Sequence, residues 1–157
     1  MRARYAARSS SVTPPGRPIA SRSRSAYDFD MTIGDTVLAS RSGTVFAVRD
    51  NFDDATRVCG QENWVFVQHA DGTAMQYVHL TRRGALVRTG DAVVQGQPIG
   101  LSGDSGCSSG PHLHVALFRD RTSFGAANTL PLNYRNAQGM LNSREGLVQG
   151  QRYEAVR

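Results

Sequence analysis

Short apolar segments separated by turns dominate this sequence and limit the folds that it can adopt. Pairs such as Ser42-Gly43 and Asp71-Gly72 are typical of turns, and such signals recur at a spacing of roughly ten residues, as in sandwiches and barrels. No stretch shows the apolar periodicity of an ordinary helix. The pattern predicts an all-β fold, in which antiparallel strands form a sandwich-like or barrel-like single domain.

The clearest of these segments is a hairpin expected over residues 63–80. Val65 and Val67 alternate with Phe66 and Gln68, so the two valines share one face of a strand. A turn at Asp71-Gly72 follows, and TAMQYVHL returns as the second strand. Further strands are expected within residues 36–48, 84–103 and 112–118, and the last within TLPLNYRN.

Positive charge is concentrated at the start of the chain. The sequence has a net charge of +5, and residues 1–27 contain no acidic residue but carry Arg2, Arg4, Arg8, Arg17, Arg22 and Arg24. A basic patch for nucleic acid is one interpretation. The sparse aromatic residues and the abundant Ser and Pro favour a solvated segment instead, so we expect no nucleic-acid partner. We expect a flexible segment over 1–26, a β domain over 27–135 and a C-terminal extension over 136–157.

Potential metal ligands gather in the second half of the chain. His112 and His114 flank Leu113 in SSGPHLHVAL, so in a strand the two imidazoles point to the same side. A catalytic zinc site takes three protein ligands, commonly His or a carboxylate, together with a water molecule. A pair of histidines alone is weak evidence for such a site, and its sequence context decides the interpretation.

Four stretches supply that context: DFDMTIGDTVLASRSGTV (28–45), VFVQHADGTAMQYVHL (65–80), VRTGDAVVQGQPIGLSGDSG (87–106) and SSGPHLHVAL (108–117). In this order they resemble the lysostaphin-like, or LytM-type, zinc endopeptidases, which cut peptide cross-links in bacterial cell walls. The resemblance implies the antiparallel β fold of that family, zinc as the cofactor and peptidoglycan peptides as the substrate. It also implies a place in the cell envelope or outside the cell, although no signal peptide and no membrane-spanning apolar run are visible.

The resemblance also assigns roles to individual residues. Asp28 and His114 match zinc ligands. His79 and His112 match two histidines beside the metal, one a general base and the other a group that polarises the attacking water or the oxyanion. A neutral imidazole, with an ordinary pKa near ~6.5, can take up a proton at neutral pH. His69 matches no functional position, and we expect it at the surface.

One expected ligand is absent from this sequence. The family places a ligating histidine four or more residues before the aspartate, but no histidine precedes Asp28 here, and Arg24 stands at the four-back position. A guanidinium has no free lone pair and keeps its charge, so it cannot ligate zinc. Asp30 lies on the same face of a regular strand as Asp28 and is an alternative ligand. The loss of an upstream segment is another explanation.

Two functions therefore remain open. The first is zinc-dependent hydrolysis of peptidoglycan peptides, impaired by an incomplete metal site. The second is that of an inactive domain that binds peptidoglycan or activates a partner hydrolase such as a wall amidase. The resemblance also brings Cys59 and Cys107 close to the same groove, which predicts a disulfide between them.

Overall fold

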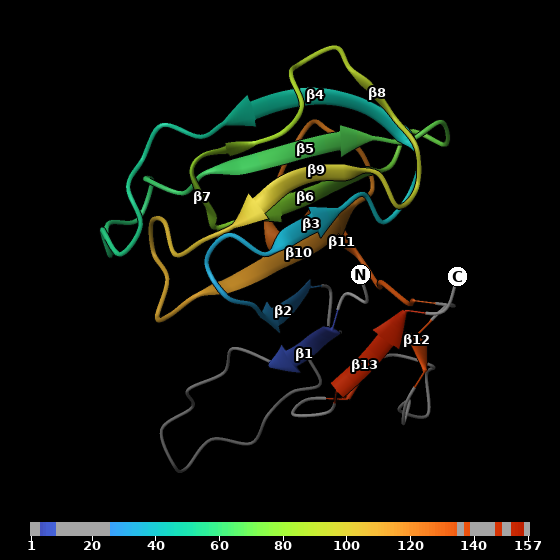
Figure 1. The fold of residues 1–157 in the computed structure, drawn as a ribbon. Coiled ribbons are helices and arrows are strands. Elements are labelled where there is room, and N and C mark those ends of the chain that lie inside the picture. The colour runs from blue at the N-terminus through green and yellow to red at the C-terminus, as the bar shows by residue number, and fades with distance from the viewer. Residues whose placement is uncertain (1–3, 9–25, 135–136, 139–146, 149–151, 156–157) are drawn as a thin grey trace.

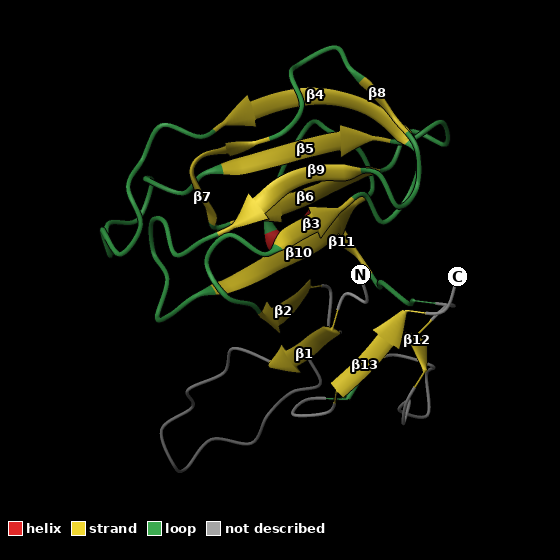
Figure 2. Ribbon diagram, in the orientation of Figure 1, coloured by secondary structure: helices red, strands yellow, loops and turns green. Residues whose placement is uncertain are grey.

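The computed structural model describes residues 4–8, 26–134, 137–138, 147–148 and 152–155. These residues form two antiparallel β-sheets (Figure 1). Their one helical element is a single 3-10 turn, η1 (Ala126–Asn128) (Figure 2), and none of their helices is long and apolar enough to cross a membrane. The expectation of an all-β, antiparallel fold is confirmed.

The larger sheet holds most of the strands. Its order is β12 (Ala137–Gln138), β13 (Arg152–Ala155), β1 (Arg4–Arg8), β2 (Ala26–Asp30), β10 (His112–Phe118), β6 (Ala74–Val78), β5 (Trp64–Gln68), β4 (Gly43–Arg49) and β8 (Ala92–Val93), with β11 (Thr129–Leu130) paired to β10. The smaller sheet has the order β3 (Thr36–Leu38), β9 (Pro98–Ser102) and β7 (Leu80–Ala85). It lies against one face of the larger sheet, over β5, β6 and β10 (Figure 1).

Strands β1, β12 and β13 lie in the two flanking segments, where the sequence analysis expected no strands. β1 pairs with both β2 and β13, and β12 pairs with β13, so these strands extend the larger sheet beyond β2. Much of the N-terminal segment expected to be flexible, residues 1–3 and 9–25, lies outside the described residues. The domain boundaries at residues 26 and 135 stay predictions.

The hydrophobic core fills the space between the two sheets. Val65 and Val67 of β5 are fully buried, as their alternation predicted, and they pair with Tyr77 and Met75 of β6. The smaller sheet contributes buried apolar side chains, namely Val37, Leu80 and Ile99. Burying one such side chain stabilises a fold by about 1.5–3 kcal/mol. The hydroxyl of Tyr77 accepts the Ser40 N–H at 2.8 Å, so its polar end is satisfied.

His69 is buried, with 4% of its surface exposed, so the expectation of a surface position was wrong. The start of β4 packs directly onto the end of β5, because a Cβ on Gly43 would collide with the Gln68 carbonyl oxygen. The ring of His69 contacts the turn before β4, where its Nδ1–H donates to the Ser42 carbonyl oxygen at 2.9 Å. Burial lowers the pKa of His69 below its ordinary value.

The burial of His69 predicts a pH-dependent stability. The unfolded chain takes up this proton near pH ~6.5, whereas the folded chain takes it up only at lower pH, so the free energy of unfolding falls as the pH drops below about 6.5. The neutral variant His69→Gln should lose part of this dependence. Urea unfolding of both proteins at about pH 7.5 and pH 5.5 measures it, and an unchanged pH dependence in the variant would contradict the prediction.

Candidate functional site

His79 lies where the chain passes from one sheet to the other. It is the single residue between β6, in the larger sheet, and β7, in the smaller one. Its φ of +66° is in the left-handed region, which costs a non-glycine residue on the order of 1–3 kcal/mol. The buried ring is held in place, because its Nδ1–H donates to the Ser105 carbonyl oxygen at 2.7 Å.

The pairing of β2 with β10 brings two acidic residues opposite two histidines. Asp28 is paired with His114 and Asp30 with His112. Because side chains alternate along a strand, these four side chains share one face of the pair, and the buried Phe29 and Leu113 take the core face. The His114 Nδ1 lies 2.6 Å from the Asp28 Oδ1, and the His112 Nε2 lies 4.0 Å from the same oxygen.

The four residues predicted for the site lie together. The ring of His79 has its centroid 4.5 Å from that of His112 and 6.2 Å from that of His114. Asp28 and His79 are each 8% exposed, while the rings of His112 and His114 are partly exposed. Three separate parts of the chain therefore contribute to one partly shielded cluster of a carboxylate and three imidazoles.

Hydrogen bonds to the backbone fix the ring orientations of His79 and His112. The Nδ1 of His112 lies 2.8 Å from the Gly110 carbonyl oxygen. A carbonyl oxygen can only accept, so in each neutral ring Nδ1 carries the hydrogen and Nε2 keeps a lone pair. Burial lowers the pKa of His79 against the opposing effect of the Ser105 carbonyl, so this ring is neutral at neutral pH and can accept a proton.

Asn63 and Ser105 bind the carbonyl of Leu80, the residue that follows His79. The fully buried Asn63 donates from Nδ2 to the carbonyl oxygens of Phe52 (2.7 Å) and Leu80 (3.1 Å), and its Oδ1 accepts the Phe52 N–H. The Ser105 hydroxyl donates to Leu80 at 2.8 Å and accepts the Asn63 N–H. Sequence reasoning missed both residues, because a lone Asn before a strand and a Ser in a Gly/Ser loop carry no distinguishing pattern.

A second network reaches the Nδ1 of His112. The Ser108 hydroxyl is 3.3 Å from the His112 Nδ1 and 2.6 Å from the Asp104 Oδ1. The Nη1 of Arg57 donates to that same Asp104 oxygen at 2.6 Å and to the Ser108 carbonyl oxygen at 2.7 Å. Burial raises the pKa of Asp104, but the hydrogen bonds from Arg57 and Ser108 outweigh it and leave this pKa below its ordinary value.

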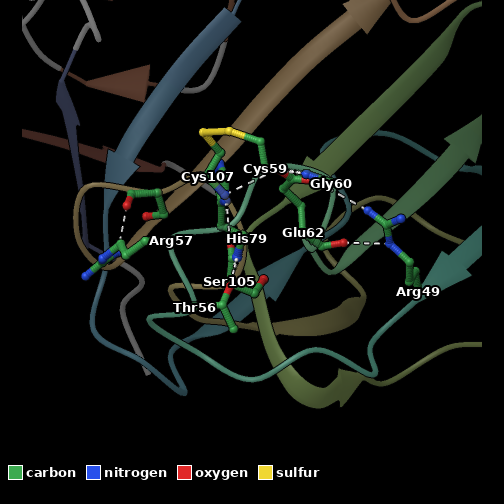
Figure 3. Close-up of a disulfide and its surroundings, with 11 residues drawn as sticks. Arg49, Thr56, Arg57, Cys59, Gly60, Glu62, His79, Ser105 and Cys107 are labelled. Atoms are coloured by element: carbon green, nitrogen blue, oxygen red, sulfur yellow. Dashed lines mark hydrogen bonds and ion pairs between the residues drawn. A yellow bond between two sulfur atoms is a disulfide. The ribbon is translucent and has the colours of Figure 1, made fainter.

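The predicted disulfide between Cys59 and Cys107 is confirmed, with the two Cα atoms 4.3 Å apart. It joins the loop before β5 to the loop before β10 (Figure 3). The Glu62 carboxylate also links the two loops, because it accepts the N–H groups of Gly60 at 3.0 Å and Cys107 at 3.2 Å. The disulfide fixes the loops on either side of His79 and removes both thiols as metal ligands.

The donor set for a metal ion is incomplete. Asp28 and His114 provide two adjacent donors, but the described part of the chain contains no group of three His, Cys, Asp or Glu residues that could hold a metal ion. Asp30 shares the face of Asp28 but does not complete such a group. Residues 1–25 contain none of these four residue types. The side chains that the structure describes therefore do not fit the three-ligand zinc site of a hydrolase.

Comparisons with known proteins agree on one family. The family model for Peptidase family M23 matches residues 22–126, more than half of the chain. The peptidoglycan DD-endopeptidase ShyA of Vibrio cholerae is 40% identical over 90 residues, which cover 57% of this chain and 19% of that protein. The chain thus spans about a fifth of the length of this curated relative.

Solved structures show the same likeness. The catalytic domain of the antimicrobial peptidase lysostaphin from Staphylococcus simulans superposes with a TM-score of 0.56 at 31% identity, over 68% of this chain and 74% of that one. A zinc-containing peptidase from Vibrio cholerae gives a TM-score of 0.50 at 32% identity, over 60% of this chain and 26% of that one.

The network around Asn63 predicts that Asn63→Asp is strongly destabilising. The new carboxylate can still accept the Phe52 N–H, but it faces two carbonyl oxygens to which Asn63 donates. We expect the free energy of unfolding to fall by more than about 2 kcal/mol at pH 7, and by less in acid, where the carboxyl is protonated and can donate. Denaturant unfolding measures both. Asn51→Asp, at an exposed position, is the matched control, and equal effects of the two substitutions would contradict the prediction.

Proposed function

Because this chain belongs to peptidase family M23, we propose that it acts on the peptides of peptidoglycan and that Asp28, His79, His112 and His114 form its active site. The observation that carries the proposal is the convergence of these four side chains within the region that matches the family. Two similar proteins support this class of substrate: ShyA is a peptidoglycan endopeptidase, and lysostaphin is an antimicrobial peptidase. A place in the envelope or outside the cell follows from that substrate.

In this proposal His79 and His112 act on the water that attacks the peptide bond. Their Nδ1–H groups are committed to backbone carbonyls, so each neutral ring offers its Nε2 to the groove. One ring takes the proton of the water that attacks the peptide carbonyl, and the other polarises that water or the oxyanion. General-base catalysis of this kind contributes about 10²–10⁴-fold to a rate. The 4.5 Å between the ring centroids lets both rings reach one peptide bond.

Zinc is the cofactor that the family implies, and Asp28 and His114 are its proposed ligands. Bound zinc would supply an acidified water and a Lewis acid for the peptide carbonyl. With the third ligand missing, we propose that zinc binds weakly. Structural zinc sites gain on the order of 10–16 kcal/mol from four ligands, or about 3 kcal/mol each, so the affinity should be lower by about a hundredfold or more.

The lack of a histidine before Asp28 also favours a second function. Residues 1–25 contain no His, Cys, Asp or Glu, so no side chain there can replace the expected histidine. A domain with this fold and an empty ligand position can still bind a wall peptide in the groove. It would then act as an inactive member of the family, which holds peptidoglycan or activates a partner wall amidase.

Incubation of the chain with purified peptidoglycan over a range of added zinc separates the two functions. The endopeptidase predicts release of soluble peptides that rises with zinc and is lost in His79→Gln and His112→Gln. Cosedimentation with peptidoglycan and no release at any zinc concentration would establish the binding function instead. If the chain neither releases peptides from peptidoglycan nor cosediments with it, the proposal that the chain acts on peptidoglycan is contradicted.

Restoring a histidine should strengthen zinc binding. Arg24 lies outside the described residues, so the prediction rests on its position four residues before Asp28. We expect Arg24→His to raise the affinity for zinc by about one to three orders of magnitude, from the contribution of one ligand, as measured by competition with a chelator. Arg24→Gln is the control, because it removes the charge without adding a nitrogen ligand.

Micromolar or tighter zinc binding by the unmodified chain would contradict this interpretation, because another group would then complete the site. Asp30→Asn tests the first candidate for that group. No effect of Arg24→His would place the missing ligand elsewhere, and histidine substitutions along residues 16–24 would locate it.

A further inference from the structure

We propose that Arg57 forms a carboxylate-binding subsite beside His112, which selects peptides that carry a free carboxylate next to the bond in the groove. This inference rests on the proposed function. Arg57 is placed by its contact with the loop that leads into β10, since its Nη1 lies 2.7 Å from the Ser108 carbonyl oxygen. The hydroxyl of the same serine is 3.3 Å from the His112 Nδ1. Ser108 thus contacts both the guanidinium and the ring of His112.

The guanidinium uses only part of its hydrogen-bonding capacity within the protein. Both of its contacts, to Asp104 and to Ser108, come from Nη1. Within the described part of the chain, Nε and Nη2 donate to no protein group, and the side chain is 47% exposed. Nε and Nη2 form the side edge of the guanidinium, whose two parallel N–H groups match the two oxygens of a carboxylate.

The backbone holds Arg57 in an unusual conformation. Its φ of +56°, and that of Ala55 at +58°, lie in the left-handed region. Such a conformation persists only where the surroundings enforce it. Here the Ala55 N–H donates to the Asp104 carbonyl oxygen at 2.9 Å, and the Gly106 N–H donates to the Thr56 hydroxyl at 3.1 Å. The disulfide at Cys59 fixes the end of the same loop, so the subsite is formed before a ligand arrives.

The acidic neighbours of Arg57 do not occupy its free edge. Asp104 is buried, with 4% of its side chain exposed, and Nη1 is the one guanidinium nitrogen of Arg57 that its Oδ1 contacts. Asp53 pairs with Arg82 at 2.8 Å, and Asp54 accepts from the Thr81 hydroxyl and the Asp104 N–H. In Figure 3 Arg57 lies to one side of His79 and Ser105, and Arg49, which pairs with Glu62, lies to the other.

The test compares two forms of one ligand. Soluble stem peptides from purified peptidoglycan are titrated into the chain before and after all their carboxyl groups are converted to amides. We expect the free acids to bind about tenfold tighter or better, as a charge-assisted bidentate pair predicts. Arg57→Gln should abolish this preference. Arg57→Lys, which keeps the charge and can still pair with Asp104, should retain only part of it.

Arg88→Gln, at an exposed arginine, is the matched control and should leave the preference unchanged. Thermal unfolding of each variant identifies any loss of folding, and the lysine variant keeps the test valid if the glutamine variant fails to fold. Equal binding of the acid and amide forms, or a full preference in Arg57→Lys, would overturn the subsite. No binding of either form by the unmodified chain would instead overturn the proposed function.

Discussion

The site depends on the antiparallel pairing of β2 with β10, which places Asp28 opposite His114. Because side chains alternate, a shift of one residue in the strand register would direct the side chains of Asp28 and the two histidines toward the core. Phe29 on one strand and Leu113 and Val115 on the other oppose such a shift, because they are buried between the sheets. The hydrophobic core thus sets the register that brings the carboxylate and the imidazoles together.

The third histidine is placed by a different constraint. His79 occupies the point at which the chain leaves one sheet for the other, and its left-handed backbone accompanies that change of direction. The cost of this conformation is offset by the hydrogen bonds of Asn63 and Ser105 to the adjacent Leu80 carbonyl. The disulfide and the Glu62 contacts then tie together the two loops that surround the ring. Backbone hydrogen bonds and a disulfide thus hold the His79 ring in place.

The contacts that hold the fold together are separate from the proposed metal ligands. The core, the disulfide and the Asn63 network involve neither Asp28 nor His114. These contacts use no metal ligand, in contrast to small domains whose structural zinc supplies the folding energy. Under the proposed function, loss of a ligand would lower the affinity for the ion without removing the contacts that hold His79, His112 and Arg57. Binding of a wall peptide and its hydrolysis would then be separable.

Much of the fold and of the candidate site could be predicted from the sequence, because both rest on local patterns. Alternation in β5 determined which valines are buried, Gly72 fitted the left-handed position of the hairpin turn, and the HxH spacing put His112 and His114 on one face. The ordered motifs indicated the family, and that resemblance selected Asp28 and His79 as candidates. The absence of a histidine before Asp28 was also visible in the sequence, since it is a matter of residue types alone.

Only the tertiary structure decided what depends on contacts between distant segments. β3 and β4 are neighbours in the chain but belong to different sheets. His69 is buried and donates to Ser42, 27 residues away, and the support of His79 comes from Asn63 and Ser105, which are 42 residues apart. Arg57 carries no sequence signal, because its position depends on the path of a loop held by a disulfide and by Asp104. Local periodicity fixes the face that a side chain takes, but packing alone fixes the groups that it meets there.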